Sequence, residues 1–472
     1  MVVGLRRITC VLVFALALGV VTFGAWGAPD LVILHMNDTH GRLFAPDRSY
    51  EGTEGGAARL ATVVREVRAE MPDRVLLLHA GDILSRGDLV TVHTGGEANI
   101  EFMNRLGYDA MTPGNGEFYM GLERTFKLKR LAKFPMIHAI PSYKDTGKAL
   151  FKPYVVKKVN GIRVGIFGPG CIREGHLSAR NLNLRNYIEA AEEHVPVLRE
   201  KCDLLVVLSH LAVDENRDLA SKVPGIQIMI CGHTHSAFPE PEWLDGPDGG
   251  RVLATQTADY GRALGRIDVC VKRTDDGVAL ASVDARRIPL DDNVEQAPDI
   301  VAFLEEQKAP LLEQICVATE TLEHTEEGET PMGTFLVNAI RSCMGTDIAL
   351  LDRDAIGAGI DQGPVTLEDV YRVHPWRNHM VIGKMTAEQL LPLLDNKDIL
   401  VAGCDARGSE WDAARLFVND APADESASFT VAMDDYLQGT TEGLMNLPVK
   451  RTRERVDTIL HEYLKEHGVG HP

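Results

Sequence analysis

The chain has 472 residues, of which 45% are hydrophobic and 25% are charged, and its formal net charge at pH 7 is −19. This length exceeds what one hydrophobic core usually supports, so we expect two domains, and the composition excludes a mainly disordered chain. The excess of acidic residues disfavours nucleic acid or an anionic membrane surface as the main partner.

Residues 1–28 have the pattern of a secretory signal peptide. Arg6 and Arg7 precede a long apolar run, and the small residues of "AWGA" place a cleavage site near Gly27 or Ala28. An uncleaved membrane anchor and a twin-arginine signal stay open as alternatives. Cleavage removes two of the 49 Lys and Arg and none of the 68 Asp and Glu, so the mature net charge is −21. No later segment contains the ~20 apolar residues that a membrane span needs, so we expect a periplasmic or secreted protein without stable membrane insertion.

Short apolar runs alternate with helical patterns from residue 31 to about 285. The runs include "LVILHMN", "RVLLLHA", "RVGIFG", "DLLVVLS" and "IQIMIC", and "AARLATVVREVRAEM" and "YIEAAEEHVPVLREKC" have the helical period. This alternation predicts a layered α/β domain over 29–290. A helical connector is predicted at 291–318, and a second, smaller α/β domain follows at 319–472. The seven cysteines after the signal are scattered without a CxxC pair, which indicates neither a zinc ribbon nor a disulfide framework and leaves their pairing open.

Seven polar residues follow the predicted strands, at the point where each strand ends. Asp38 and His40 follow "LVILHMN", where an extended chain would point side chains two residues apart in the same direction. The ligand-type residues at the ends of the later strands are Asp82, Asn115, His210, His233 and His235. In an α/β sheet, sites lie beyond the carboxyl ends of parallel strands, so we expect all seven to converge.

Each of these residues has an ordinary structural interpretation when it is taken alone. Asp82 and Asn115 are typical of turn caps, and His210 of a buried core histidine. Seven of them on five strand ends favour a metal site instead, whereas His35, His79, His93 and His138 lack such a spacing and are predicted to be structural. Imidazole and oxygen ligands without thiolate suit Mn²⁺, Zn²⁺ or iron better than Ca²⁺. Seven ligands suit two ions that share a carboxylate, and such a pair activates a bridging hydroxide for displacement at phosphorus.

The motifs "LHMNDTHGRL", "HAGDILS", "PGN", "LSHL" and "CGHTH" resemble, in order, those of the calcineurin-like metallophosphoesterases, and specifically of the secreted 5′-nucleotidases. The resemblance implies a β-sandwich flanked by helices and a metal-dependent hydrolase of phosphoric ester bonds, acting on nucleotides or related small molecules. It implies that Asp38, His40 and His235 bind the first ion, that Asn115, His210 and His233 bind the second, and that Asp82 bridges them. Asn115 and His210 are also the predicted catalytic residues.

The stretch "PGNGEFYMG" departs from this resemblance. The family usually has a His after the Asn and an Asp three residues later, which together stabilise the transition state. This chain has Gly116 and Tyr119 at those positions. Loss of such a donor costs on the order of 10² to 10⁴ in rate but leaves the metal-activated nucleophile.

The second half resembles the C-terminal domain of the 5′-nucleotidases, where arginines and stacked aromatic rings hold the nucleotide. Trp376 matches one stacking ring, Tyr436 lies near the other, and Arg377 is a candidate replacement for a missing guanidinium. Gly357 stands where the family has an arginine, and "GTTEG" replaces the usual GGDG. These departures leave the choice of substrate open.

Two alternatives to a 5′-nucleotidase-type enzyme of nucleotide catabolism stay open. "GNGEFYMGLER" also resembles the sulfate thiohydrolase of the sulfur-oxidation system, which likewise lacks the His and acts on thiosulfonates. The other alternative is a weakly active or non-catalytic metal-containing binding protein. The oligomeric state cannot be deduced from the sequence.

Overall fold

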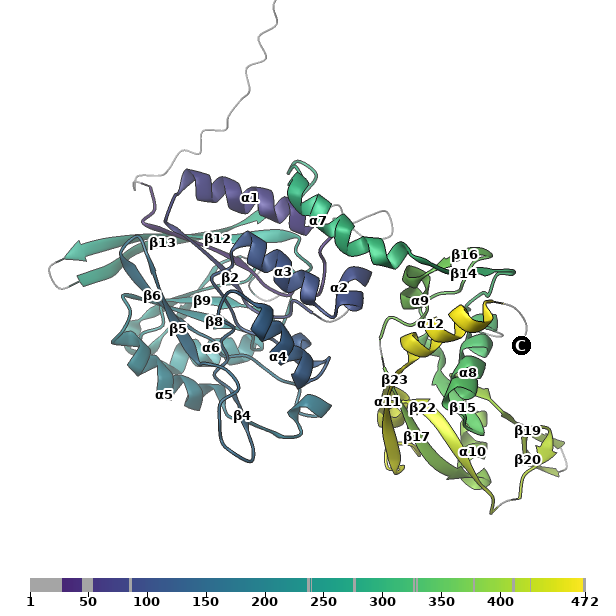
Figure 1. Ribbon diagram of the computed structural model, residues 1–472. Helices are drawn as coiled ribbons and strands as arrows, with labels where there is room; N and C mark the ends of the chain where they lie inside the picture. The colour runs from purple at the N-terminus through teal and green to yellow at the C-terminus, as the bar shows by residue number, and fades with distance from the viewer. Residues whose placement is uncertain are drawn as a thin grey trace, which may run out of the picture.

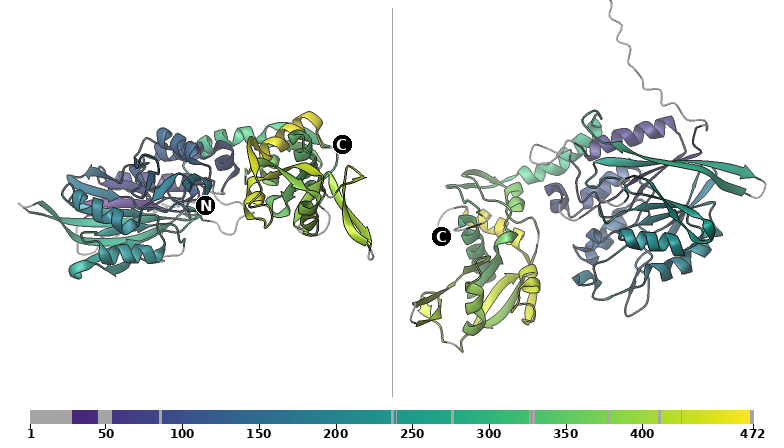
Figure 2. Two further views of the ribbon diagram at one scale, coloured as in Figure 1. Left: turned by 90° about the horizontal axis from the view of Figure 1, so that it is seen from below. Right: turned by 180° about the vertical axis from the view of Figure 1, so that it is seen from behind.

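The computed structural model describes residues 28–44, 54–84, 87–235, 238, 240–274, 277–325, 327, 330–376, 378–409, 412–424 and 426–469. The predicted signal peptide, apart from its last residue, and Arg377 lie outside the described residues. Two lobes are joined by helix α7 (Pro298–Lys308), as Figure 1 shows and the two views of Figure 2 confirm. The predicted α/β class is confirmed.

The first lobe is a sandwich of two β-sheets. One sheet has the order β13 (Gly277–Pro289), β12 (Ala263–Thr274), β1 (Leu31–Met36), β2 (Val75–His79) and β3 (Ala110–Met111). The other has the order β10 (Glu242–Asp245), β11 (Arg251–Thr255), β9 (Ile228–Cys231), β8 (Leu204–Ser209), β6 (Ile162–Phe167) and β5 (Tyr154–Val159). Within each sheet the central strands β1–β2–β3 and β6–β8–β9–β11 run parallel, so their carboxyl ends share an edge.

Alternating apolar side chains explain the sandwich. Leu31 and Ile33 of β1 face Ile166 of β6 and Leu208 of β8 in the core between the sheets. The intervening side chains of β1, such as Leu34, face outward into a second core. Each fully buried aliphatic side chain stabilises the fold by roughly 1.5–3 kcal/mol relative to exposure.

Helices cover both outer faces of the sandwich. Helices α1 (Ala57–Glu70), α3 (Glu97–Leu106) and α7 contribute apolar residues to the outer core of the first sheet. Helices α5 (Tyr187–Arg199) and α6 (Val213–Lys222) cover the second sheet. Shorter elements lie among the connections: α2 (Leu89–Thr94), the 3₁₀ turn η1 (Gly116–Phe118), α4 (Leu122–Leu131), and the small strand pair β4 (Pro141–Tyr143) and β7 (Leu182–Leu184).

The helical pattern predicted to lead into the second half stops early. Helix α7 and the 3₁₀ turn η4 (Ala309–Leu312) are followed by strand β14 (Gln314–Ala318), which pairs with β16 (Gly363–Thr366). Pro310 has no backbone N–H to donate and restricts the residue before it, which favours an end to the helix there. The end of this segment is therefore part of the second lobe.

The second lobe is built on a five-stranded sheet. Its order is β18 (Ile399–Ala402), β15 (Ile348–Asp352), β22 (Ser428–Asp434), β17 (His379–Thr386) and β23 (Val449–Arg455). Its helices are α8 (Pro331–Met344), α9 (Leu367–Val373), α10 (Ala387–Leu394), α11 (Asp435–Thr440) and α12 (Val456–His467). Strands β19 (Cys404–Ser409), β20 (Asp412–Val418) and β21 (Ala421–Pro422) form a separate small sheet. Helix α9 packs against α2 and η4, and the Tyr371 hydroxyl lies 3.3 Å from His93 Nδ1.

None of the helices in the described ranges is both long and apolar enough to cross a lipid bilayer. The seven cysteines between residues 28 and 469 are all free thiols.

Candidate metal centre

The seven predicted ligands lie on loops that leave the carboxyl ends of strands in both sheets. The loops after β1, β2 and β3 carry Asp38, His40, Asp82 and Asn115, and the loops after β8 and β9 carry His210, His233 and His235. The prediction of neighbouring parallel strands is correct within each sheet. Because the set is divided between two sheets, the site lies at one end of the sandwich.

The loops after β1 and β2 run side by side past the ends of their strands. Backbone N–H groups of Asp38 and His40 donate to the carbonyls of Gly81 and Asp82, each at 2.9 Å. Strand β1 ends at Met36, and both Asp38 and His40 have a positive φ of 48° and 46°. The expectation that an extended chain aligns their side chains was therefore wrong, because a left-handed turn places them.

The first cluster consists of Asp38, His40 and His235, whose ligand-type atoms all lie within 4.8 Å of one another. His40 Nε2 lies 2.8 Å from His235 Nε2, and His235 Nε2 lies 3.9 Å from Asp38 Oδ1. The Asp259 carboxylate lies 3.1 Å from His235 Nδ1, which fixes the orientation of this ring. Two imidazole nitrogens that approach so closely beside a buried carboxylate form a suitable donor set for a divalent cation.

Asp82 and His210 form a buried pair between the clusters. His210 Nδ1 lies 2.6 Å from the Ala80 carbonyl, and its Nε2 lies 3.3 Å from Asp82 Oδ1. Although burial alone would lower the pKa of His210, the charge of Asp82 raises it to about 10. Burial alone would raise the pKa of Asp82, but the neighbouring His210 charge lowers it to about 2. A divalent ion that bound at His210 Nε2 would require the neutral ring, so metal binding at this pair would compete with protonation of His210.

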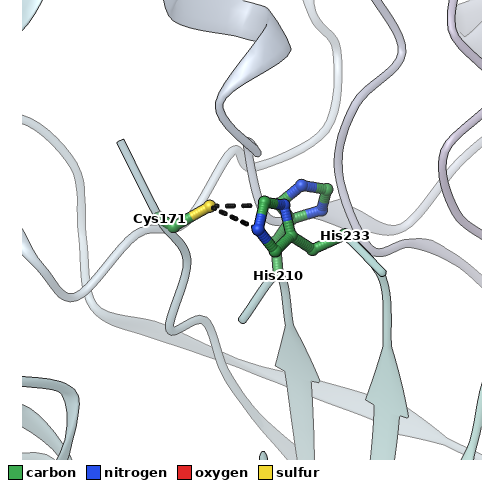
Figure 3. A group of neighbouring side chains, drawn as sticks. All are labelled: Cys171, His210 and His233. Carbon is green, nitrogen blue, oxygen red and sulfur yellow. Dashed lines mark hydrogen bonds between the residues drawn. The ribbon is translucent and has the colours of Figure 1, made fainter. Parts of the chain in front are cut away.

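A second cluster contains His210, His233 and a residue that the sequence prediction missed, Cys171. The Cys171 thiol donates to Asn115 Oδ1 at 3.3 Å. Its Sγ lies 3.6 Å from His233 Nδ1, and Figure 3 shows it with the two histidines. Asn115 Nδ2 donates to the Tyr119 hydroxyl at 2.8 Å, which leaves Oδ1 facing the cluster. Cys171 follows β6 in a loop with no spacing relation to the other ligands, so no sequence pattern indicated it.

One buried carboxylate ties two of these loops together. Glu117 accepts hydrogen bonds from the backbone N–H groups of Asp82 (3.0 Å), Leu84 (3.1 Å) and Gly114 (2.7 Å). Burial and then the negative charge of Asp82 raise the pKa of Glu117 to about 8. Glu117 is thus a positioning residue for the loops after β2 and β3.

Comparison with known proteins identifies the family. Residues 31–237 match the calcineurin-like phosphoesterase family, and residues 311–448 match the 5′-nucleotidase C-terminal domain. The chain belongs to the calcineurin-like phosphoesterases of 5′-nucleotidase type.

Relatives extend over most of the chain. A trifunctional nucleotide phosphoesterase of Bacillus subtilis is 28% identical over 427 residues, which cover 79% of this chain but only 28% of that protein. A 5′-nucleotidase of Vibrio cholerae is 25% identical over 428 residues, and the match covers 75% of that protein. The crystal structure of a 5′-nucleotidase precursor from Thermus thermophilus superimposes with a TM-score of 0.61 at 25% identity, covering 93% of this chain and 97% of that one. The chain spans a third or less of the length of the first two curated relatives it matches.

Gly116 distinguishes this chain from the family pattern that the sequence motifs resemble. Its N–H donates to Asp82 Oδ1 at 2.7 Å. Its backbone does not have the positive φ that would favour glycine over other residues. A Cβ at this position would lie 3.0 Å from both Asp82 Oδ1 and the Leu84 carbonyl oxygen, which is a tight but not prohibitive contact. Tyr119, at the other departure, has its ring centroid 5.3 Å from that of His176.

The predicted substrate residues lie in the second lobe, apart from the metal-type cluster. Trp376 follows α9 and is 44% exposed, and Tyr436 lies in the first turn of α11 and is 58% exposed. The third, Arg377, lies outside the described residues. Neither described ring is part of the second lobe's buried core.

The four histidines predicted to be structural lie in different surroundings. His35 and His138 are buried, and burial lowers the pKa of each to about 3. His79 Nε2 lies 3.3 Å from the Thr39 hydroxyl, and His93 contacts Tyr371 between the lobes. Their structural role stays a prediction.

Proposed function

We propose that the chain is an exported phosphoesterase of 5′-nucleotidase type that uses two divalent ions to hydrolyse small phosphate esters, nucleotides or related compounds. The observation that supports this most is the arrangement of two His-rich clusters around the buried carboxylates Asp38 and Asp82. In this proposal Asp38, His40 and His235 hold one ion, Asn115, His210 and His233 hold the other, and Asp82 is shared.

The donor chemistry fits Mn²⁺, Zn²⁺ or iron, since imidazole and carboxylate ligands suit these ions. Bound there, a pair of divalent ions supplies an activated water and positive charge that stabilises an in-line displacement at phosphorus. The protein's own residues then have separate tasks. Asp259 orients His235, the Ala80 carbonyl orients His210, and the Gly116 N–H fixes one oxygen of Asp82.

The missing side chain at Gly116 has a consequence for the reaction. No imidazole projects from this position to donate to the leaving group or to the developing charge. We therefore expect slow turnover of poor leaving groups, and faster turnover of esters such as nitrophenyl phosphates, whose leaving group needs no protonation.

The test is an assay of protein loaded separately with Mn²⁺, Zn²⁺ or Fe²⁺ on nitrophenyl phosphates, nucleotides and thiosulfonates. We expect metal-dependent phosphate release, together with two bound ions per chain by elemental analysis. Asp82→Ala should abolish the activity and most of the bound metal, because its carboxylate serves both ions. Asp284→Ala, at an exposed position on β13, is the matched control and should retain both.

The assay on thiosulfonates tests whether the same fold carries out a different hydrolysis. Hydrolysis of thiosulfonates but not of phosphate esters would refute the proposal and favour a thiohydrolase. Two bound ions without turnover of any of the three substrate classes would favour a binding protein.

A further inference from the structure

Cys171 lies against the ligands proposed for the second ion, on a different element from all of them. Its Sγ contacts Asn115 Oδ1 at 3.3 Å and His233 Nδ1 at 3.6 Å. Sγ and ring nitrogens of His210 and His233 lie within 4.8 Å of one another, and Figure 3 shows the Cys171 sulfur pointing toward the imidazole rings. The neighbours of the thiol are thus atoms that ligate metals.

An independent observation points to a ligand at the same place. His210 is fully buried, its Nδ1 is held by the Ala80 carbonyl, and its Nε2 makes no hydrogen bond although it lies 3.3 Å from Asp82 Oδ1, the shared ligand of the proposed function. A buried ring nitrogen and a buried carboxylate oxygen that lie close together without a hydrogen bond are placed as two ligands of one cation would be. A divalent ion coordinated by His210 Nε2 and Asp82 would satisfy both atoms.

The backbone around Cys171 is fixed relative to His210. Gly170 forms a parallel bridge with His210, and the His210 N–H donates to the Pro169 carbonyl at 2.9 Å. A Cβ on Gly170 would lie 2.8 Å from the Pro113 carbonyl oxygen and 2.9 Å from His138 Nε2, so the close approach requires glycine. The thiol is therefore held beside the histidine by main-chain contacts, and its position does not depend on a flexible loop.

We propose that Cys171 is a sulfur ligand of the ion held by Asn115, His210 and His233. This inference rests on the proposed function and extends it, because it makes the two metal positions chemically unequal. The position that includes Asp38, His40 and His235 offers only nitrogen and oxygen. The other offers a soft sulfur donor, which favours Zn²⁺ over Mn²⁺ and Mg²⁺.

Packing alone does not account for the position of this side chain. A buried structural cysteine normally behaves as a small apolar residue among other apolar groups. Cys231 is an example, since it packs in the apolar core behind the second sheet. Cys171 is only partly buried, and its Sγ contacts an amide oxygen and an imidazole ring.

The experiment is X-ray absorption at the zinc edge on the full chain loaded with Zn²⁺. We expect a sulfur scatterer at about 2.3 Å in addition to nitrogen and oxygen. Loading with Co²⁺ instead should give a thiolate-to-metal charge-transfer band in the near ultraviolet. Both signals should disappear in Cys171→Ser and persist in Cys343→Ser, which changes an exposed cysteine of α8.

A competition measurement gives a second readout that does not depend on turnover. With Zn²⁺ and Mn²⁺ at fixed ratio, Cys171→Ser should shift the occupancy of one of the two positions toward Mn²⁺ by about 10-fold or more. The Cys343→Ser control should leave the ratio unchanged.

The outcomes separate this inference from the proposed function. Two bound ions with only nitrogen and oxygen scatterers would overturn the sulfur ligand and leave the dinuclear proposal standing. A chain that binds no divalent ion would overturn both. If Cys171→Ser fails to fold, the wild-type spectrum alone decides the question, because it reports the sulfur directly.

Discussion

Five of the seven proposed ligands have a left-handed backbone: Asp38, His40, Asp82, His233 and His235. Such a conformation costs a residue other than glycine of order 1–3 kcal/mol, and it persists only where the surroundings enforce it. Here the enforcement is visible, because the Asp38 carbonyl accepts from the Tyr260 N–H at 2.8 Å and both oxygens of Asp38 accept from the His233 N–H at 3.0 Å. The fold thus maintains an unfavourable backbone conformation that directs these side chains toward one place, as expected of a functional site.

Gly116 provides a direct test of what the site lacks. We expect Gly116→His to raise kcat for phosphate esters by ~10-fold or more, because an imidazole there would act as the missing donor. Gly116→Ala is the matched control, since it adds the same Cβ contacts with Asp82 and Leu84 without the imidazole, and it should give no increase. Steady-state kinetics on folded protein with two bound ions measures both. An equal kcat in the His and Ala variants would count against a site that merely lost its donor.

At the level of elements, the 3₁₀ turn η1 is connected to the loops that carry metal ligands through one side chain, that of Glu117. Glu117→Ala would leave three buried N–H groups, those of Asp82, Leu84 and Gly114, without their acceptor. At about 1–3 kcal/mol for each of these three unsatisfied groups, we expect the metal-free protein to lose at least about 3 kcal/mol of unfolding free energy. Denaturant unfolding in the presence of a chelator measures the loss without interference from metal release. Glu123→Ala, on the exposed face of α4, should change stability by less than about 0.5 kcal/mol, and an equally small effect at Glu117 would contradict the role.

The strands and their ends could be predicted from the sequence, whereas parts of the site could not. Apolar runs indicated β1, β2, β8 and β9, because a strand buried on both faces is apolar along its whole length. Their division between two sheets depends on long-range pairing, which single runs do not encode. Cys171 was missed for a similar reason, since its loop reaches the cluster only through the bridge between Gly170 and His210. A lone cysteine in a loop has no periodicity to reveal it.

The second lobe contains a buried histidine that should make it sensitive to acid. Burial lowers the pKa of His374 from 6.5 to about 4, although the charge of Asp457 acts in the opposite direction. A histidine whose folded pKa is depressed binds its proton more readily when unfolded, so stability is lost as the pH falls from 6.5 toward 4.

We expect this single group to account for about 2 kcal/mol of the stability difference between pH 7 and pH 5. His374→Leu should reduce that difference by the same amount, whereas His467→Leu, at an exposed position of α12, should not. Urea unfolding followed by circular dichroism at the two pH values measures it. An unchanged pH dependence in folded His374→Leu would refute the assignment.

At the scale of the whole molecule, charges of the second lobe act on a histidine in a loop of the first lobe that also reaches the metal cluster. The pKa of His176 is lowered, mainly by burial, and the charges of Asp435 and Arg451 from the second lobe also act on it. The His176 ring packs on Tyr119, whose hydroxyl accepts from Asn115. Charges of the second lobe thus act on a residue that packs beside the hydrogen-bond partner of a proposed ligand, and Tyr436 is next to Asp435 in the sequence. The sequence indicated the two halves but not this electrostatic relation, because it depends on how the folded lobes are placed.

Trp376 tests whether the second lobe takes part in substrate binding. A tryptophan in a core would cost about 3–5 kcal/mol on truncation, but this ring is 44% exposed, so we expect Trp376→Ala to change stability by less than about 1 kcal/mol. If the ring stacks on a nucleotide base, its loss removes a face contact of ~0.5–1.5 kcal/mol, and KM for nucleotides should rise roughly 3- to 10-fold at unchanged kcat. Trp243→Ala, which removes a similarly exposed ring on β10 of the first lobe (42%), should leave KM unchanged. Kinetics on nucleotides and on a nitrophenyl phosphate measure the change in KM, and thermal melting measures the change in stability. A lower Tm with unchanged KM would show that Trp376 supports the fold and does not bind substrate.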